Sequence, residues 1–178
     1  MSVALNGCQP PSDGDRGRLE LESASLAWRA SHLAARAGLD LELSKSAREA
    51  LRSGVELTIT VDLRFTRRYR WFARELYTDH YHWRIAYQPL SRHYRLTSPL
   101  DDQVVNLPHL SQVSEELTTP RWYPTRTQSK TLGSGRYQLQ TRARLNRLQL
   151  PGPLQLPALF SRQWLLTTSW QPIPVPSP

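Results

Sequence analysis

The sequence predicts a mainly β protein, an antiparallel two-sheet sandwich with one or two short helices. Apolar and polar side chains alternate along several stretches, and this period of two is typical of strands that are buried on one face. The stretches contain many β-branched and aromatic residues, which favour strands. Runs with a helical period are few and short. Strands with one apolar face bury it by packing two sheets together, so we expect a sandwich.

The clearest predicted strand lies within residues 54–66, GVELTITVDLRFT. Its apolar residues occupy every second position, and threonine or charged residues stand between them. We therefore expect a half-buried strand whose other face meets water. The apolar set is Leu57, Ile59, Val61, Leu63 and Phe65. Similar alternation predicts strands within residues 39–44, 82–88 and 136–148, and a core strand within 161–170 with Trp164 and Trp170 on one face.

Two short helices are predicted between the strands. In residues 44–54, Ser46 and Glu49 have the spacing of a capping box, and Gly54 provides a left-handed end. In residues 107–119, Pro108 stands near the first turn. The apolar positions of this second helix, which share one face, are Leu110, Val113 and Leu117.

The domain organisation follows from the two ends of the chain. Residues 1–17 include QPPSDGDRG, whose prolines, glycines and small polar residues predict a flexible leader. Residues 18–171 form a single predicted β-rich domain. Residues 172–178 carry proline at every second position, so we expect an extended proline-rich tail that forms no strand ladder. A chain of 178 residues with 39% hydrophobic residues can bury a core without disulfides or metals.

The charge of the chain is strongly positive. Its formal net charge is +8 and its pI about 10.2, and all of its basic residues except Lys45 and Lys130 are arginines. This balance attracts anions, which include nucleic acid, acidic phospholipid headgroups and acidic protein surfaces. A positive total charge also serves solubility alone.

The best candidate for a contact surface is residues 64–77, RFTRRYRWFARELY. Arg67, Arg68 and Arg70 are candidates for contact with an anion or a membrane. Tyr69 or Trp71 could stack on bases or lie at a lipid interface.

A second interpretation of this stretch places its aromatic residues in the protein core. Phe65, Trp71 and Phe72 would then fill the sandwich, and the arginines would form a solvated rim. Sequence patterning favours this second interpretation, so we expect the aromatic residues to matter less than the arginines for any surface contact.

Four segments resemble successive landmarks of a proteobacterial family of envelope proteins, domain-of-unknown-function family 4390. They are EALRSGVELTITVDLRFTR, YRWF, HWRIAYQPLSRHYRL and ALFSRQWLLTTSW, and the resemblance covers roughly residues 39–171. The resemblance implies export to the envelope and no established activity. It also implies, as a partner, an envelope protein such as a membrane sensor kinase of the nitrogen-regulation type, because family members are often encoded beside one.

Residues 5–8, LNGC, resemble a bacterial lipobox, in which Leu5, Gly7 and Cys8 hold the expected positions. Cys8 is therefore a candidate for lipidation, and the flexible leader would serve as its tether. The preceding MSVAL lacks the basic and apolar regions of a signal peptide. The lipoprotein hypothesis requires an earlier start that supplies them. The alternative is an incidental thiol in a flexible leader and a cytoplasmic protein.

The histidines of DHYH, His80 and His82, would share one face of a strand, with Asp79 beside them. Paired imidazoles bind zinc or copper, but the sequence shows no third ligand. His93 could approach across a hairpin through residues 88–91. We expect polar residues at the mouth of a loop, and no metal site.

Catalytic signatures are not found in the sequence. It contains no G-x-S-x-G elbow, P-loop or dinucleotide fingerprint. Glu115 and Glu116 are adjacent on a predicted helix and would point in different directions, unlike a catalytic carboxylate pair. We expect neither an enzyme nor a cofactor.

These observations together predict a non-catalytic, envelope-associated accessory or adaptor domain, lipid-anchored in the periplasm. Its expected partners are an anionic membrane surface and, by family analogy, a membrane sensor kinase. One alternative is a cytoplasmic nucleic-acid-binding module that uses the arginine-rich surface. Another is a carrier of an apolar ligand held between the two sheets.

Overall fold

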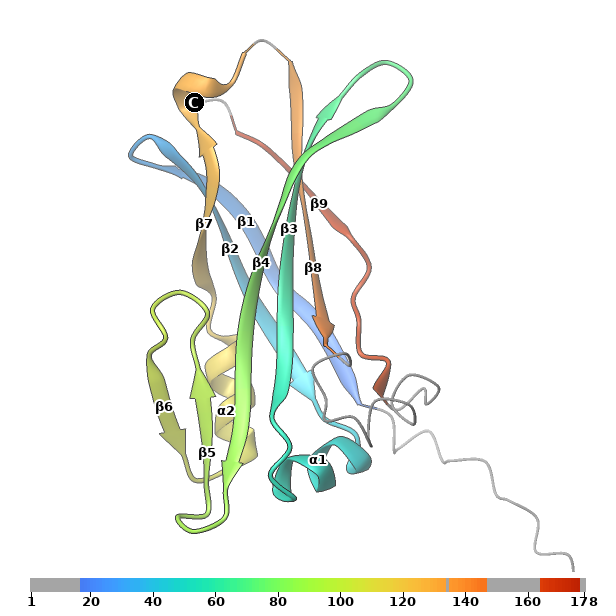
Figure 1. Ribbon diagram of the computed structural model, residues 1–178. Helices are drawn as coiled ribbons and strands as arrows, with labels where there is room; N and C mark the ends of the chain where they lie inside the picture. Colours follow the sequence, from blue (N-terminus) through green and yellow to red (C-terminus); the bar gives the residue numbers. More distant parts are fainter. Residues whose placement is uncertain (1–16, 134, 147–163, 177–178) are drawn as a thin grey trace, which may run out of the picture.

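The computed structural model describes residues 17–133, 135–146 and 164–176 (Figure 1). Within these residues the chain is mainly β, and its strands form two antiparallel sheets. The elements, in chain order, are β1 (Arg18–Arg29), β2 (His32–Glu42), α1 (Lys45–Arg52), β3 (Leu57–Arg68), β4 (Ala73–Gln88), β5 (His93–Thr97), β6 (Val104–Leu107), α2 (Leu110–Thr118), β7 (Arg121–Gln128), a 3₁₀ turn (Ser129–Thr131), β8 (Arg136–Leu145) and β9 (Gln171–Pro174).

The smaller sheet has the strand order β1-β2-β7, and the larger sheet has the order β6-β5-β4-β3-β8-β9. Every pair of neighbouring strands is antiparallel. The two sheets face each other across one apolar core. The predicted sandwich with two short helices is therefore confirmed.

The core is built from the apolar faces of both sheets. The five predicted core positions of β3 are buried, and Leu33, Leu39 and Tyr123 meet them from the smaller sheet. A hydrogen bond of 2.9 Å from Trp83 Nε1 to the Tyr123 hydroxyl joins the two layers and satisfies both buried polar groups.

The prediction that β3 has one face in water is wrong. Thr60 and Asp62 lie on the outer face, yet both are 0% exposed, and Thr58 and Thr66 are also buried. The reason is the place of β3 between β4 and β8. Long polar side chains of these neighbours cover its outer face, as described below for Asp62. Strand β3 therefore lies between a layer of polar side chains on its outer face and the apolar core on its inner face.

Helix α1 lies where the sequence predicted it, but it is capped by a different serine. Ser44 is the N-cap, and its hydroxyl accepts a hydrogen bond of 3.3 Å from the Ala47 amide. Ser46 is therefore already inside the helix. After the C-terminus, Gly54 has a φ of 89°, as the predicted left-handed end requires.

Helix α2 begins after His109, whose amide donates to the Gln112 side chain. Its Val113 and Leu117 are buried against the core. Beside these two residues, the hydroxyl of Ser114 donates to the Leu41 carbonyl at 2.7 Å, and the hydroxyl of Thr118 donates to the Leu39 carbonyl. Strand β7 pairs with β2 only as far as Ala37, so α2 supplies partners for the β2 edge beyond that point.

The C-terminal segment differs from the sequence prediction in two respects. Residues 172–174, expected in a tail without a ladder, belong to β9, which pairs with β8 at the edge of the larger sheet. An edge strand tolerates proline because one row of its amides needs no partner. The described part of the predicted strand within 161–170 makes one isolated bridge, Arg144 to Thr167, and is not a regular strand. Trp164 is buried in the core, whereas Trp170 lies over Arg64 and Arg142 on the outer face.

Candidate functional site

The β3–β4 hairpin ends in residues 69–72, which project from the sandwich at one end of the molecule (Figure 1). A hydrogen bond of 2.8 Å from the Tyr69 amide to the Phe72 carbonyl closes the loop. Below the loop, the pairing register shifts between Phe65 and Thr66, and such a bulge bends and twists a hairpin. The loop is therefore carried away from the core on two long, paired strands. We call residues 67–74 the hairpin tip.

The aromatic residues of the hairpin tip lie in solvent, which corrects the expectation that they fill the core. Trp71 is 86% exposed and Phe72 61% exposed, whereas Phe65 is buried as predicted. Phe65 lies within β3, belongs to the core cluster and stacks on Tyr77 and Tyr137, but the loop extends beyond the sandwich. Tyr69 and Phe72 stack on each other at a centroid distance of 4.8 Å. The tip thus presents an ordered aromatic surface that nothing in the described residues buries.

Two of the three predicted contact arginines line a hollow beside these rings. Arg68, Tyr69, Arg70 and Arg136 surround a volume of about 620 Å³, which we call the tip hollow. Arg136, the first residue of β8, lies directly opposite Arg68 in the strand register. The sequence prediction missed Arg136, because only the pairing of β3 with β8 brings it to this place.

The third predicted arginine has a different role. The Arg67 guanidinium lies over the rings of Tyr69 and Tyr137, at 5.3 and 5.8 Å from their centroids, and its side chain is half-buried. Arg67 therefore joins the Tyr69 ring of the tip to the Tyr137 ring of β8 through cation–π contacts. Arg70 lies over Trp71 at 5.3 Å and remains exposed.

Positive charge at the tip has no acidic counterpart in the adjoining sequence. Residues 67–74 and 133–137 contain no Asp or Glu. The first acidic residue along β4, Glu75, forms an ion pair of 3.5 Å with Arg64. Arginines and exposed aromatic rings therefore share one projecting surface. This combination suits an anionic surface with an apolar layer beneath it.

A second group of charged residues covers the outer face of the larger sheet, around Asp62. This carboxylate accepts hydrogen bonds from His80 Nδ1 at 2.7 Å, from Arg144 Nε at 2.9 Å and from two nitrogens of Arg142, the shorter at 2.7 Å. The register explains the cluster, because His80 and Arg142 are the direct neighbours of Asp62 on β4 and β8. Burial alone would raise the pKa of Asp62, but the hydrogen bonds from Arg144, Arg142 and His80 bring that pKa below its usual 3.8.

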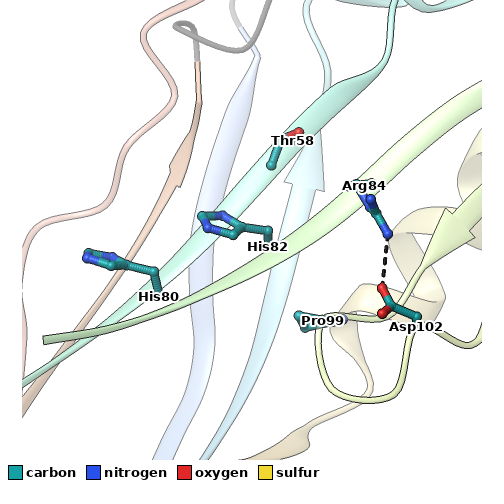
Figure 2. A pocket seen from close by; sticks show the side chains of 6 residues that line it. All are labelled: Thr58, His80, His82, Arg84, Pro99 and Asp102. Carbon is teal, nitrogen blue, oxygen red and sulfur yellow. Dashed lines mark hydrogen bonds and ion pairs between the residues drawn. The ribbon is translucent and has the colours of Figure 1, made fainter.

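The pocket beside this cluster contains both histidines of the DHYH motif (Figure 2). Thr58, His80, His82, Arg84, Pro99 and Asp102 line a volume of about 310 Å³, which we call the outer-face pocket. A hydrogen bond of 3.0 Å joins His82 Nδ1 to the Thr60 hydroxyl. Arg84 donates to Asp102 at 2.9 Å across the pocket, as Figure 2 shows.

A family model described as a domain of unknown function, DUF4390, matches residues 17–174, which span both the hairpin tip and the outer-face pocket. The chain belongs to the DUF4390 family. Comparison with curated proteins and with solved structures gave no match. The match to the DUF4390 domain begins one residue before β1 and ends at Pro174, the last residue of β9.

The other residues weighed as possible metal ligands, Asp79 and His93, do not join the two histidines in this DUF4390 domain. Asp79 forms an ion pair of 2.7 Å with Arg126, and His93 lies opposite Gln88 at the far end of β4. Within residues 17–133, 135–146 and 164–176, no group of three or more His, Cys, Asp or Glu is placed to hold a metal ion.

Two further residues singled out in the sequence, Glu115 and Glu116, belong to neither site of the DUF4390 domain. Glu116 forms an ion pair with Arg121, while its neighbour Glu115 is exposed on α2. Cys8 lies outside the described residues. Neither helix in the described part of the chain has the length and hydrophobicity needed to cross a bilayer.

Proposed function

We propose that this domain is a non-catalytic, envelope-associated binding protein that docks on anionic membrane surfaces through the hairpin tip. One observation carries the proposal. Exposed Trp71 and Phe72 project at the same end of the molecule as the arginines of the tip hollow. Trp and Tyr are enriched at the headgroup level of membranes, and arginines bind the phosphates of anionic lipids.

The two kinds of side chain reinforce each other on such a surface. Each basic residue near an anionic leaflet contributes about 1 kcal/mol at most, and this contribution is screened by salt. Burial of an aromatic ring in the interface adds a contribution that salt does not screen. Arg68, Arg70 and Arg136 together could therefore strengthen binding by up to about 3 kcal/mol at low salt. The rings would retain part of the binding at physiological salt.

A lipid anchor at Cys8 would turn this weak contact into a stable one. A flexible tether holds the domain close to the bilayer, and the resulting local concentration lets a weak surface contact act. A domain held in this way in the periplasm would also be placed to contact an envelope protein such as a membrane sensor kinase, in an accessory or adaptor role. Palmitate labelling of the Cys8→Ser variant against the parent, with fractionation, tests the anchor. An unlabelled parent in the cytoplasmic fraction would contradict it.

Vesicle co-sedimentation tests the docking surface. Two double variants that remove the same charge are compared. The first combines Arg68→Gln and Arg70→Gln in the tip, and the second, the control, combines Arg52→Gln and Arg92→Gln. Arg52 ends α1 and Arg92 lies in the turn between β4 and β5, and both are exposed. Figure 1 shows α1 and this turn at the opposite end of the molecule from the hairpin tip. Strand β4, which runs between the tip and the turn, has 16 residues and spans roughly 50 Å. We expect the first pair to weaken binding to vesicles containing phosphatidylglycerol by about tenfold or more and the second pair to leave it unchanged. Equal losses in both variants would show that net charge, and not the tip, is responsible.

Single-stranded nucleic acid is the second candidate ligand, because Trp71 is exposed enough to stack on a base between arginines. Fluorescence anisotropy with a labelled oligouridine measures this binding. A steep dependence on salt, together with tighter binding to RNA than to vesicles at physiological salt, would favour the nucleic-acid module and contradict membrane docking.

Carriage of an apolar ligand receives less support from the structure. The tip hollow lies at the hairpin end and the outer-face pocket lies outside the larger sheet. Between the two sheets, the buried side chains of both pack together in the core that the described residues form.

A further inference from the structure

The outer-face pocket lies well away from the hairpin tip. His82 is nine residues from the start of β4, which corresponds to roughly 30 Å along the strand. The wall of the pocket is formed by β3, β4 and the turn between β5 and β6. The pocket is therefore separate from the membrane-docking surface proposed above, and the inference below does not depend on that proposal.

Both imidazoles in the pocket are held through the same ring nitrogen. His80 donates Nδ1–H to the buried Asp62 carboxylate, and the hydrogen bond of His82 Nδ1 is made with Thr60. Asp62 and Thr60 are both 0% exposed, so these anchors belong to the body of the sheet. In each ring Nε2 is the nitrogen left for a ligand. Figure 2 shows the two rings projecting side by side from the same face of β4.

Charged residues lie both in the pocket and beside it. Arg84 on β4 and Asp102 in the β5–β6 turn line the pocket. Arg142 and Arg144 on β8 lie beside it, where both bind the carboxylate of Asp62 on β3. Together these are three guanidinium groups and two carboxylates, a surplus of one positive charge. Burial first, and then His80 and Arg144, lower the pKa of His82 below 6.5, which fits a site that disfavours additional cations.

Arg84 is free to exchange its partner for a ligand. Its hydrogen-bond partner Asp102 has a side chain that is 85% exposed, and exposed ion pairs contribute little. Thr58 adds a hydroxyl to the pocket wall. The polar groups available to a ligand are therefore a guanidinium, two imidazole edges and a hydroxyl at separate points. This arrangement suits a tetrahedral oxyanion better than a planar carboxylate, which prefers a single fork.

We infer that the outer-face pocket binds a small phosphate monoester through His80, His82 and Arg84. A volume of about 310 Å³ is at the lower limit of small-molecule sites, so the ligand is small. A neutral His80 that donates from Nδ1 to Asp62 has an unprotonated Nε2, which accepts a hydrogen bond from a hydroxyl group of the ligand.

Isothermal titration of the full chain with glycerol 3-phosphate tests the inference. We expect His82→Gln and Arg84→Gln each to weaken binding by about tenfold or more, since each removes a hydrogen bond to a charged group. The matched controls His93→Gln and Arg92→Gln, at the far end of β4, should bind as the parent does. No binding by the parent at millimolar ligand, or equal binding by all four variants, would overturn the inference.

A further variant distinguishes this site from the tip. Arg68→Gln with Arg70→Gln should leave glycerol 3-phosphate binding unchanged, and a loss in that variant would assign the phosphate to the tip hollow instead.

Discussion

Removal of the Asp62 charge should destabilise the domain more than any other substitution of a carboxylate in the described part of the chain. In Asp62→Asn, one oxygen can still accept from His80, but the new amide group faces the guanidinium groups of Arg142 and Arg144. Three hydrogen bonds from arginine nitrogens are lost at Oδ2. Hydrogen bonds to charged groups contribute about 1.5–3 kcal/mol each, which gives an upper limit of roughly 5–9 kcal/mol.

Solvent exposure of the arginines reduces this limit. The side chains of Arg142 and Arg144 are 31% and 32% exposed, so water recovers part of the lost interaction, whereas the Asp62 side chain is 1% exposed. We expect Asp62→Asn to lower the free energy of unfolding by about 3 kcal/mol, in the range found when one partner of a buried pair is removed. For a chain of this length the melting temperature should fall by roughly 6–12 °C. Urea denaturation followed by tryptophan fluorescence measures the loss.

The pH dependence of the loss identifies its cause. The pKa of Asp62 is lower in the folded protein than its usual 3.8, so the charged carboxylate stabilises the fold above that pH. This stabilisation is lost as the pH falls through the folded-state pKa, and the gap between parent and Asp62→Asn should shrink below about pH 4. Asp102→Asn, which removes an exposed ion pair, is the control and should melt with the parent. A loss under about 0.5 kcal/mol at neutral pH, or a gap that does not narrow as the pH falls below about 4, would refute this reasoning.

Three other variants test the fold and the tip. Val61→Asp places a charge at a position that is 0% exposed and should unfold the domain. The control, Val104→Asp on the exposed edge strand β6, should stay folded. Circular dichroism that shows a folded Val61→Asp variant would contradict the assignment of the core face. Gly54→Val should lower the free energy of unfolding by about 1 kcal/mol or more, because φ is 89° at this residue and a β-branched side chain resists that conformation. Space around the residue is open, so an unchanged stability would mean that the backbone relaxes. The double variant Trp71→Ala with Phe72→Ala should melt within about 1–2 °C of the parent, because neither ring contributes to the core. A large fall in melting temperature would show that both rings pack in the core, as the sequence suggested.

Sequence patterning predicted best those strands whose alternation is regular. The apolar positions of β3 and the histidine face of β4 follow directly from a period of two. Strand β1 was missed, and its pairing with β2 is interrupted by a bulge between Leu21 and Ser23. Strand β7 contains Pro124 and β9 contains Pro172, which sequence reasoning takes as breaks. Both are edge strands of their sheets, where proline is tolerated.

The sites were harder to predict because they depend on pairing between distant residues. Arg136 reaches the tip hollow, and Arg142 reaches Asp62, only through the register of β8 with β3. The burial of Asp62 was missed for the same reason. Trp71 and Phe72 were assigned to the core because hydrophobicity was considered without the length of the hairpin, which carries them beyond the second sheet.

The position of Trp71 at a membrane tests the central claim most directly. The measurement is quenching of tryptophan fluorescence by lipids brominated along their acyl chains, in vesicles that contain phosphatidylglycerol, with Trp71→Phe as the reference for the other five tryptophans. We predict that bromines near the headgroup end quench the parent, that this quenching is absent from Trp71→Phe, and that vesicles without anionic lipid give little quenching. Binding to anionic vesicles with equal quenching in the parent and in Trp71→Phe would contradict docking through the hairpin tip.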